Sequence, residues 1–322
     1  MVKIEVISRT KGLKGLSTDE LAIGEPTSEL IKLISEANRN ISIDRLRVTI
    51  KDVGSRKVSQ IPLDPKISIA ESAGIPDDAQ EITLYVKDLG PQIAWRTVFL
   101  VEYLGPLLIH PVFYHLTSIY SGLDVAHTQT QQLAYVIVLL HFLKRELETV
   151  YVHKFSSSTM PLFNIFKNSS HYWILSGFNL AYFIYAPQNP SFKSSWLTKT
   201  LFHVNDLPSY LNYTLFFAWL AAEIANFKCH LITSNLRKSD GEGYVIPYGF
   251  FFKYVSFPNY FFETLAWFIF AVLTGNWTAY VFLVVAGGQM LIWAIQKHKK
   301  YLKLFGDDYK KLKRTSMIPY VI

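Results

Sequence analysis

The sequence predicts an α-helical polytopic membrane protein that carries a small soluble domain at its N-terminus. The predicted soluble domain covers residues 1–88, and the predicted membrane domain covers residues 91–322. Charged residues make up 27 of the first 90 positions but only 30 of the other 232, and 48 of the 49 aromatic residues follow position 90. Long apolar runs separated by clusters of charge are typical of multiple membrane crossings. A wholly soluble enzyme is therefore disfavoured.

The N-terminal domain combines three strand-like runs with one helical segment. Apolar and polar residues alternate in residues 2–8, 45–51 and 81–87, which is the period of a half-buried β-strand. Residues 28–38 instead space their apolar side chains as an amphipathic helix does. This order predicts a ubiquitin-like β-grasp domain on the cytosolic side, with a generic small α+β domain as the alternative.

Six apolar runs in the second domain each approach the roughly 20 residues that cross a bilayer core. They lie at about residues 95–119, 130–149, 170–186, 210–232, 256–274 and 277–295. Residues 248–254 are also apolar, so about six to seven transmembrane helices are expected. Basic residues gather after the second, fourth and sixth runs, as they do in cytosolic loops. With six spans, both termini lie in the cytosol.

Composition narrows the class of protein further. Cys229 is the only cysteine, so no internal disulfide can form and a reduced setting fits best. The first residues lack the apolar core of a cleavable secretory signal, so an internal segment is expected to direct membrane insertion. The net charge of +7 comes from basic residues beside apolar runs, which is typical of cytosolic juxtamembrane loops that meet anionic lipid or a phosphate-bearing ligand, and it does not indicate nucleic-acid binding.

Several polar residues fall where lipid would otherwise be expected. Glu102 lies inside an apolar run, where a carboxylate facing lipid would cost several kcal/mol, so it should face the bundle interior. A structural hydrogen bond between helices is the alternative. His141, Arg145 and Glu148 share one helical face, although a solvated helix end would give the same pattern. Further polar groups lie in or around the fourth and fifth runs: Asn226, Arg237, Tyr244, Asn259, Tyr260 and Glu263.

Motifs for several other chemistries are absent from the sequence. Neither a Rossmann glycine fingerprint nor a P-loop is present, and no G-x-S-x-G elbow supports a hydrolase. The repeated histidine boxes of membrane di-iron oxidases are also missing, so no metal site is predicted. Glu102 and Tyr260 remain as the acid–base candidates, while the basic and amide groups suit an anionic cofactor.

Five segments together resemble one enzyme family: EYLGPLLIHPVFY, HFLKRELETVYVHKFSSSTMPLFNIFKN, ANFKCHLITSNLR, FPNYFFETLAW and the tail from KHKKYLKLFGDDY to MIPYVI. They look like the very-long-chain trans-2-enoyl-CoA reductases of the endoplasmic reticulum membrane, within the steroid 5α-reductase superfamily. The resemblance implies reduction of a long-chain trans-2-enoyl-CoA by NADPH, the last step of each fatty-acid elongation cycle. It also implies the other enzymes of the elongation complex as partners.

The resemblance further implies roles for individual residues. Arg145 corresponds to a basic position near the superfamily's NADPH site, and His298 is a weaker candidate in the tail. The positions that contact NADPH correspond to Asn226, Arg237, Tyr244, Asn259, Glu263 and Tyr301. Glu102 corresponds to an intramembrane acid near the substrate carbonyl. Steroid reductases pair that acid with a tyrosine in the second conserved helix, where this sequence has Phe142. That departure favours Tyr260 as the proton donor.

Three alternatives to this function remain open at the level of sequence. Another reductase of the superfamily would act on a steroid or a polyprenol. Membrane methyltransferases share a similar C-terminal helical arrangement and would bind S-adenosylmethionine instead of NADPH. A non-catalytic ubiquitin-like membrane adaptor would need no acid at Glu102 and no polar network.

Overall fold

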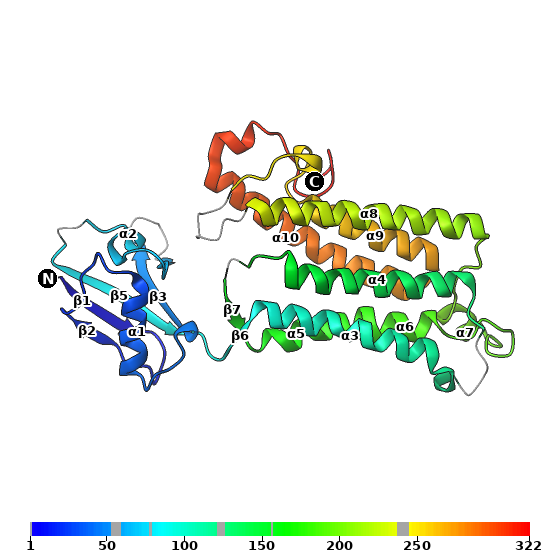
Figure 1. The fold of residues 1–322 in the computed structure, drawn as a ribbon, viewed down its shortest axis with the longest axis horizontal. Coiled ribbons are helices and arrows are strands. Elements are labelled where there is room, and N and C mark those ends of the chain that lie inside the picture. Colours follow the sequence, from blue (N-terminus) through cyan, green and yellow to red (C-terminus); the bar gives the residue numbers. More distant parts are fainter. Residues whose placement is uncertain (1, 53–58, 77–78, 121–125, 156, 237–244) are drawn as a thin grey trace. The chain divides into compact units, whose positions relative to one another are not determined.

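The computed structural model describes all residues except 1, 53–58, 77–78, 121–125, 156 and 237–244. The chain divides into two compact units. The first unit combines Met1–Trp95 with Ser157–Asn164, and the second combines Arg96–Ser156 with Ile165–Ile322. Strands dominate the first unit and helices dominate the second (Figure 1).

The first unit is a five-stranded sheet with one long helix packed against it (Figure 1). Its strands run in the order β2-β1-β5-β3-β4, with β1 parallel to β5 and every other neighbouring pair antiparallel. The elements are β1 (Lys3–Ser8), β2 (Leu16–Thr18), α1 (Thr27–Ala37), a 3₁₀ turn (Ile43–Arg45), β3 (Leu46–Asp52), β4 (Ser59–Pro62), α2 (Ile69–Ala73) and β5 (Glu81–Asp88).

The core of the first unit follows directly from the alternation in its sequence. Ile4 and Val6 of β1 are buried, as are Ile82 and Leu84 of β5, while the residues between them face outward. Leu30 of α1 belongs to the same buried cluster. Since successive side chains of a strand point to opposite faces, one face of the sheet meets the helix. The three predicted strand runs and the predicted helix are all present.

A short antiparallel pair joins residues far apart in the sequence. β6 (Gln92–Ala94) pairs with β7 (Thr159–Pro161), and the Trp95 amide donates to the Ser158 carbonyl over 3.2 Å. The chain leaves the first unit at β6 and returns to it at β7, between the second and third expected spans.

An ion pair in the first unit predicts that its stability depends on pH. Arg45 Nε and Nη2 donate to the two carboxylate oxygens of Asp88 over 3.0 and 2.6 Å. This guanidinium holds the pKa of Asp88 below its ordinary value near 3.8. Because the folded-state pKa is depressed, the pair stabilises the fold above that ordinary value and stops doing so as the pH falls through the folded-state pKa.

We therefore expect the protection factors of amides in β3 and β5, which correct for intrinsic exchange, to fall only as the pH drops below about 4. Asp88→Asn, which retains the shape of the side chain but not the charge, should lose part of this fall. Identical pH profiles for the wild type and Asp88→Asn, measured by hydrogen–deuterium exchange, would contradict the assignment.

The second unit is helical throughout its described secondary structure, apart from isolated bridges and turns. Its helices are α3 (Trp95–His115), a 3₁₀ turn (Thr117–Tyr120), α4 (Gln129–Tyr151), α5 (Asn164–Ser170), a π-helical stretch (His171–Asn179), α6 (Leu180–Ile184), α7 (Trp196–Leu201), α8 (Ser209–Leu236), a 3₁₀ turn (Phe250–Lys253), α9 (Pro258–Thr274) and α10 (Trp277–Lys310). Each of the six predicted apolar runs contains helix. Residues 248–254, considered as a seventh span, hold only one 3₁₀ turn.

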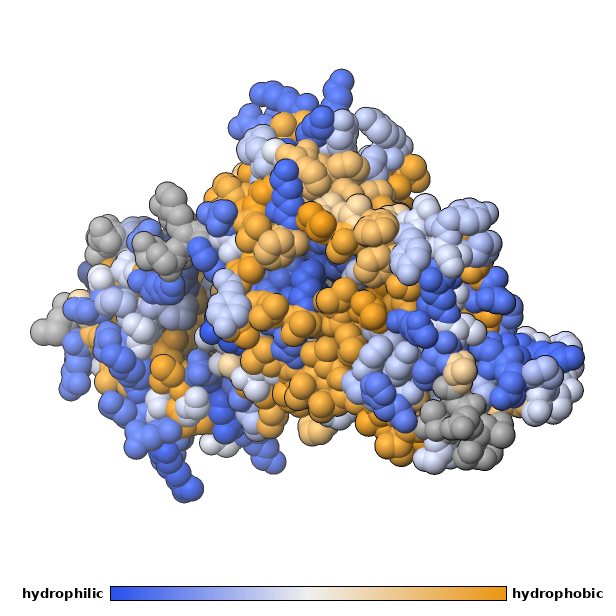
Figure 2. Space-filling view, turned by 45° about the vertical axis from the view of Figure 1, so that its right-hand side comes forward, coloured by the Kyte–Doolittle hydropathy of each residue, from blue (hydrophilic) through white to orange (hydrophobic). Residues whose placement is uncertain are grey.

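Among the described residues of this unit, three helices are long and apolar enough to cross a membrane, namely α3, α8 and α10. Hydrophobic residues cover much of the visible surface of the helices (Figure 2). Leu143 and Leu147 of α4, Ile224 of α8 and Val284 of α10 are among these exposed side chains. Apolar surface of this extent, on helices of this length, fits a lipid environment. The unit is a membrane domain.

Candidate active site

A stripe of charged residues on α4 lies inside the helix bundle. His141, Lys144, Arg145 and Glu148 follow one another at helical spacing, and the exposed fractions of His141 and Glu148 are only 3% and 1%. α4 packs against α8 and α9 here. The alternative of a solvated helix end is therefore wrong for these residues.

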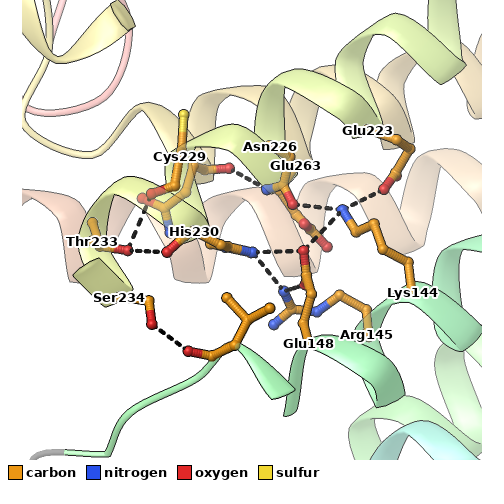
Figure 3. A network of polar contacts seen from close by, with 12 residues as sticks. Lys144, Arg145, Glu148, Glu223, Asn226, Cys229, His230, Thr233, Ser234 and Glu263 are labelled. Carbon is orange, nitrogen blue, oxygen red and sulfur yellow. Dashed lines mark hydrogen bonds and ion pairs between the residues drawn. The ribbon is translucent and has the colours of Figure 1, made fainter. Parts of the chain in front are cut away.

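The partners of this stripe come mainly from α8 (Figure 3). Lys144 Nζ lies 2.6 Å from Glu223 Oε2 and donates to Asn226 Oδ1, also over 2.6 Å. His230 Nδ1 lies 3.0 Å from Glu148 Oε1. We call this set the buried charge network; its members are His141, Lys144, Arg145, Glu148, Glu223, Asn226, His230 and Glu263.

α9 supplies the third side of the network. Glu263 Oε1 lies 3.3 Å from His141 Nε2, and the Asn226 amide donates to the Asn259 carbonyl over 2.9 Å. Pro258 is the first residue of α9, where a backbone N–H would have no acceptor within the helix, so proline costs no hydrogen bond there. Four of the predicted cofactor residues, Arg145, Asn226, Asn259 and Glu263, are thus brought together by three helices.

α3 closes the network on another side. Arg145 Nη2 donates to the Tyr103 hydroxyl over 2.9 Å, and Nη1 lies 2.6 Å from Glu148 Oε2. Glu102, next to Tyr103, is 1% exposed, as its predicted orientation away from lipid requires. Its Oε2 atom has no hydrogen-bond partner among the residues that the structure describes. A buried, unpaired carboxylate oxygen is costly, and a bound ligand could supply its partner.

The helix α3 is not interrupted by the Gly105-Pro106 pair that follows Glu102. α3 runs through Pro106, and the Trp173 indole N–H donates to the Val101 carbonyl over 2.9 Å. A Cβ atom on Gly105 would lie 2.1 Å from the Trp173 ring. Glycine is therefore needed at this position so that the indole can approach the helix.

A second group of predicted residues lies around the start of α9. The Tyr260 hydroxyl accepts a hydrogen bond from Lys297 Nζ over 2.8 Å. The ring of Phe257 connects Tyr260 to Tyr301, with ring centroids 5.9 and 5.6 Å apart. His298 Nδ1 lies 2.6 Å from Ser256 Oγ, so both predicted tail residues contact the segment that leads into α9.

Two predicted cofactor residues, Arg237 and Tyr244, lie outside the described residues. In the described part of the chain, no hydrogen bond joins Tyr260 directly to the buried charge network. The two groups are connected through the backbone, because Asn259, which accepts from Asn226, directly precedes Tyr260.

Four residues of these two groups are not predicted from the sequence, namely Glu223, Tyr103, Lys297 and His230. Glu223 is 4% exposed and lies in the apolar run LFFAWLAAEIANF. The reasoning that selected Glu102, an acid at membrane depth, applies to Glu223 equally and could have found it. Tyr103, Lys297 and His230 carry no comparable signal, because they matter only through partners that are distant in the sequence.

Two members of the network, Glu148 and His230, together with His153 outside it, have the composition of a metal site. Ligand atoms of Glu148, His153 and His230 lie within 4.8 Å of one another. However, Arg145 Nη1 lies 2.6 Å from Glu148 and 3.3 Å from His230 Nδ1, where the guanidinium neutralises the carboxylate and would repel a divalent cation. The absence of a metal site stays a prediction.

Comparison with known proteins finds one matching family and several individual relatives. The family described as 3-oxo-5-alpha-steroid 4-dehydrogenase matches residues 158–322. The chain is 36% identical to the very-long-chain enoyl-CoA reductase of Dictyostelium discoideum, over the full length of both chains. It is 47% identical to an enoyl reductase of Schizosaccharomyces pombe over 74% of this chain and 76% of the relative. It is 31% identical to the human trans-2,3-enoyl-CoA reductase-like protein over 75% and 64%, respectively.

The helical unit has an apolar surface and a buried cluster of charged side chains. These two features together are typical of an integral membrane enzyme. The chain belongs to the very-long-chain enoyl-CoA reductase family, within the wider family of 3-oxo-5-alpha-steroid 4-dehydrogenases. It is therefore an oxidoreductase, and the resemblance found in its sequence is confirmed.

Proposed function

We propose that this protein reduces trans-2-enoyl-CoA to saturated acyl-CoA with NADPH, as the last step of the fatty-acid elongation cycle. The single observation that carries the proposal is the convergence of Arg145, Asn226 and Glu263 within a hydrophobic bundle. Relatives across the full length of the chain are named for this substrate. Partners in an elongation complex and a location in the endoplasmic reticulum follow from the same proposal.

The residues present fit a nicotinamide cofactor. Amide, carboxyl and cationic side chains from α4, α8 and α9 meet in one place, and the unpaired Oε2 of Glu102 lies beside them on α3. Lys297 and Tyr301, which belong to α10, contact Tyr260 and Phe257 at the start of α9. Separate polar regions of this kind suit a cofactor that has an amide ring at one end and phosphates at the other. Bound NADPH would supply the hydride for C3 of the enoyl group.

The protein's own residues would then manage charge and protons. Because the Tyr260 oxygen accepts from Lys297, its own proton is free to be donated toward C2 of the substrate. The Lys297 ammonium would stabilise the negative charge left on that oxygen. Glu102, in its protonated form, would donate to the thioester carbonyl and orient it from α3. Exposed and half-buried apolar helix faces would accommodate the acyl chain.

We propose that the N-terminal unit is a ubiquitin-like β-grasp domain in the cytosol, spanning residues 1–88. Its support is the strand order, with a central parallel pair and a helix across one face. We further propose six membrane spans in residues 91–322, with both termini in the cytosol. The proposal is supported by the helix within each of the six apolar runs.

Substrate class is tested by NADPH oxidation with detergent-purified protein. A panel should contain trans-2-enoyl-CoAs of several lengths, 3-oxo-4-ene steroids and a polyprenol. We expect oxidation with the enoyl-CoAs and no oxidation with the others. Steroid or polyprenol reduction at a comparable rate would favour another activity of the wider family, and no turnover of any kind would favour an adaptor.

Arg237 offers a separate test of the cofactor. A guanidinium can bind phosphate with two hydrogen bonds, and NADPH carries a 2′-phosphate. Arg237→Ala should therefore raise the KM for NADPH more than the KM for enoyl-CoA. Arg39→Ala, in the N-terminal unit, is a matched control that should change neither constant. An unchanged KM for NADPH in Arg237→Ala would remove this residue from the cofactor site.

A further inference from the structure

His141 lies between two carboxylates that belong to two other helices. Its Nδ1 is 2.8 Å from Glu223 Oε1 on α8, and its Nε2 is 3.3 Å from Glu263 Oε1 on α9. The ring is also held edge-on by Trp267 and Phe142, with centroids 4.8 and 4.9 Å away. These four contacts hold the imidazole with a carboxylate at each ring nitrogen.

A carboxylate at each ring nitrogen favours a proton on both nitrogens. A neutral imidazole has one N–H, so its other nitrogen would direct a lone pair at a carboxylate oxygen. An imidazolium donates from both nitrogens, and hydrogen bonds between two charged groups are the stronger kind. The geometry therefore favours the charged form of His141.

The balance of charge in the buried charge network leads to the same form. Arg145 Nη1 faces His230 Nδ1 over 3.3 Å, and since arginine can only donate, this nitrogen accepts and His230 is neutral. The three carboxylates of the network then exceed its one lysine and one arginine by a single negative charge. A proton on His141 makes the numbers equal. An uncompensated charge in a buried place is strongly destabilising, so a neutral network is favoured.

We propose that His141 is a permanent imidazolium and acts as a positioning residue that fixes Glu223 and Glu263. Through Glu223 it also fixes Lys144, whose ammonium holds Asn226 over 2.6 Å. Glu263 and Asn226 are expected cofactor contacts, so the expected effect of His141 on the affinity for NADPH rests on the proposed function. The protonation state of His141 is independent of the proposed function.

Protonation is measured by ¹⁵N NMR on purified protein labelled at histidine. The signals of His141 are assigned as those that disappear from the spectrum of His141→Gln. If that variant fails to fold, they are assigned as the histidine signals that shift in Glu223→Gln. Near neutral pH we expect both nitrogens in the protonated range. A His141 nitrogen in the unprotonated range would overturn the proposal.

Stability provides a readout that distinguishes charge from shape. His141→Gln leaves one carboxylate in excess, whereas the double variant His141→Gln/Glu223→Gln has equal charges again. The double variant should therefore unfold at a higher temperature than His141→Gln alone. If instead the two losses add, His141 acts through packing and the proposal fails.

The positioning role is measured by NADPH titration, followed through nicotinamide fluorescence. We expect His141→Gln, if folded, to raise the Kd for NADPH roughly 5- to 100-fold, as coupled neighbours in one network do. His203→Gln, at an exposed histidine outside the network, should leave the Kd unchanged. An unchanged Kd in His141→Gln overturns the positioning role. If the wild type itself binds no NADPH, the proposed function fails, while the protonation result is unaffected.

Discussion

Tyr260→Phe is expected to lower the turnover number for enoyl-CoA about 10²- to 10⁴-fold, which is the usual contribution of a general acid. This corresponds to roughly 3 to 5.5 kcal/mol of transition-state stabilisation. The substitution removes only the hydroxyl, and the ring keeps its contacts with Phe257 and Trp293. Folding and NADPH binding should therefore survive. Pre-steady-state measurement of product formation gives the rate of the chemical step directly.

Glu102→Gln is the matched control for this prediction. It preserves the shape of the side chain and can donate to a carbonyl through its amide N–H, but it cannot supply a proton, so an orienting role should be partly tolerated. A folded, NADPH-bound Tyr260→Phe that reduces enoyl-CoA at a near wild-type rate would contradict the assignment of the acid. Glu102 or a bound water would then be the better proton source.

Arg145→Met is expected to have the largest effect on stability, about 3 to 5 kcal/mol. Methionine retains much of the apolar stem but leaves Glu148 Oε2 without its partner at 2.6 Å and Tyr103 without its partner at 2.9 Å. Both of those side chains are buried. The free energy of unfolding in detergent, measured by denaturant titration of the membrane domain, tests this expectation.

Arg96→Met supplies the comparison, because Arg96 is exposed on α3. A surface substitution of this kind usually changes stability by less than about 0.5 kcal/mol. If Arg145→Met cost no more than Arg96→Met, Lys144 and His230, at 3.7 and 3.0 Å from Glu148 Oε1, would be sufficient to neutralise that carboxylate.

The helices of the membrane domain could be predicted because a bilayer imposes a length and a composition on each span. The α4 stripe could be predicted in part, since spacing along one helix places Arg145 and Glu148 on the same face. Spacing along one helix could not predict which residues on other helices these side chains contact. Glu223 is 82 positions from His141, and only the packing of α8 against α4 brings the two together.

In the N-terminal unit, the long strands have clear alternation, whereas β2 and β4 are short edge strands with little pattern to recognise. The β6–β7 pair was not predicted, because it joins segments more than 60 positions apart through three residues each. Long-range pairing of short strands is determined by tertiary structure and leaves little trace in local sequence. The same limit applies to the partners of Tyr260, since Lys297 lies on another helix.

The central claim is that this chain transfers hydrogen from NADPH to C3 of a trans-2-enoyl-CoA. Mass spectrometry of the product provides the most direct test, with purified protein and NADPH deuterated in turn on each face of the nicotinamide C4. We predict saturated acyl-CoA that carries one deuterium at C3 from one of the two cofactors and none from the other. Saturated product without deuterium from either cofactor, or no saturated product, would contradict the claim.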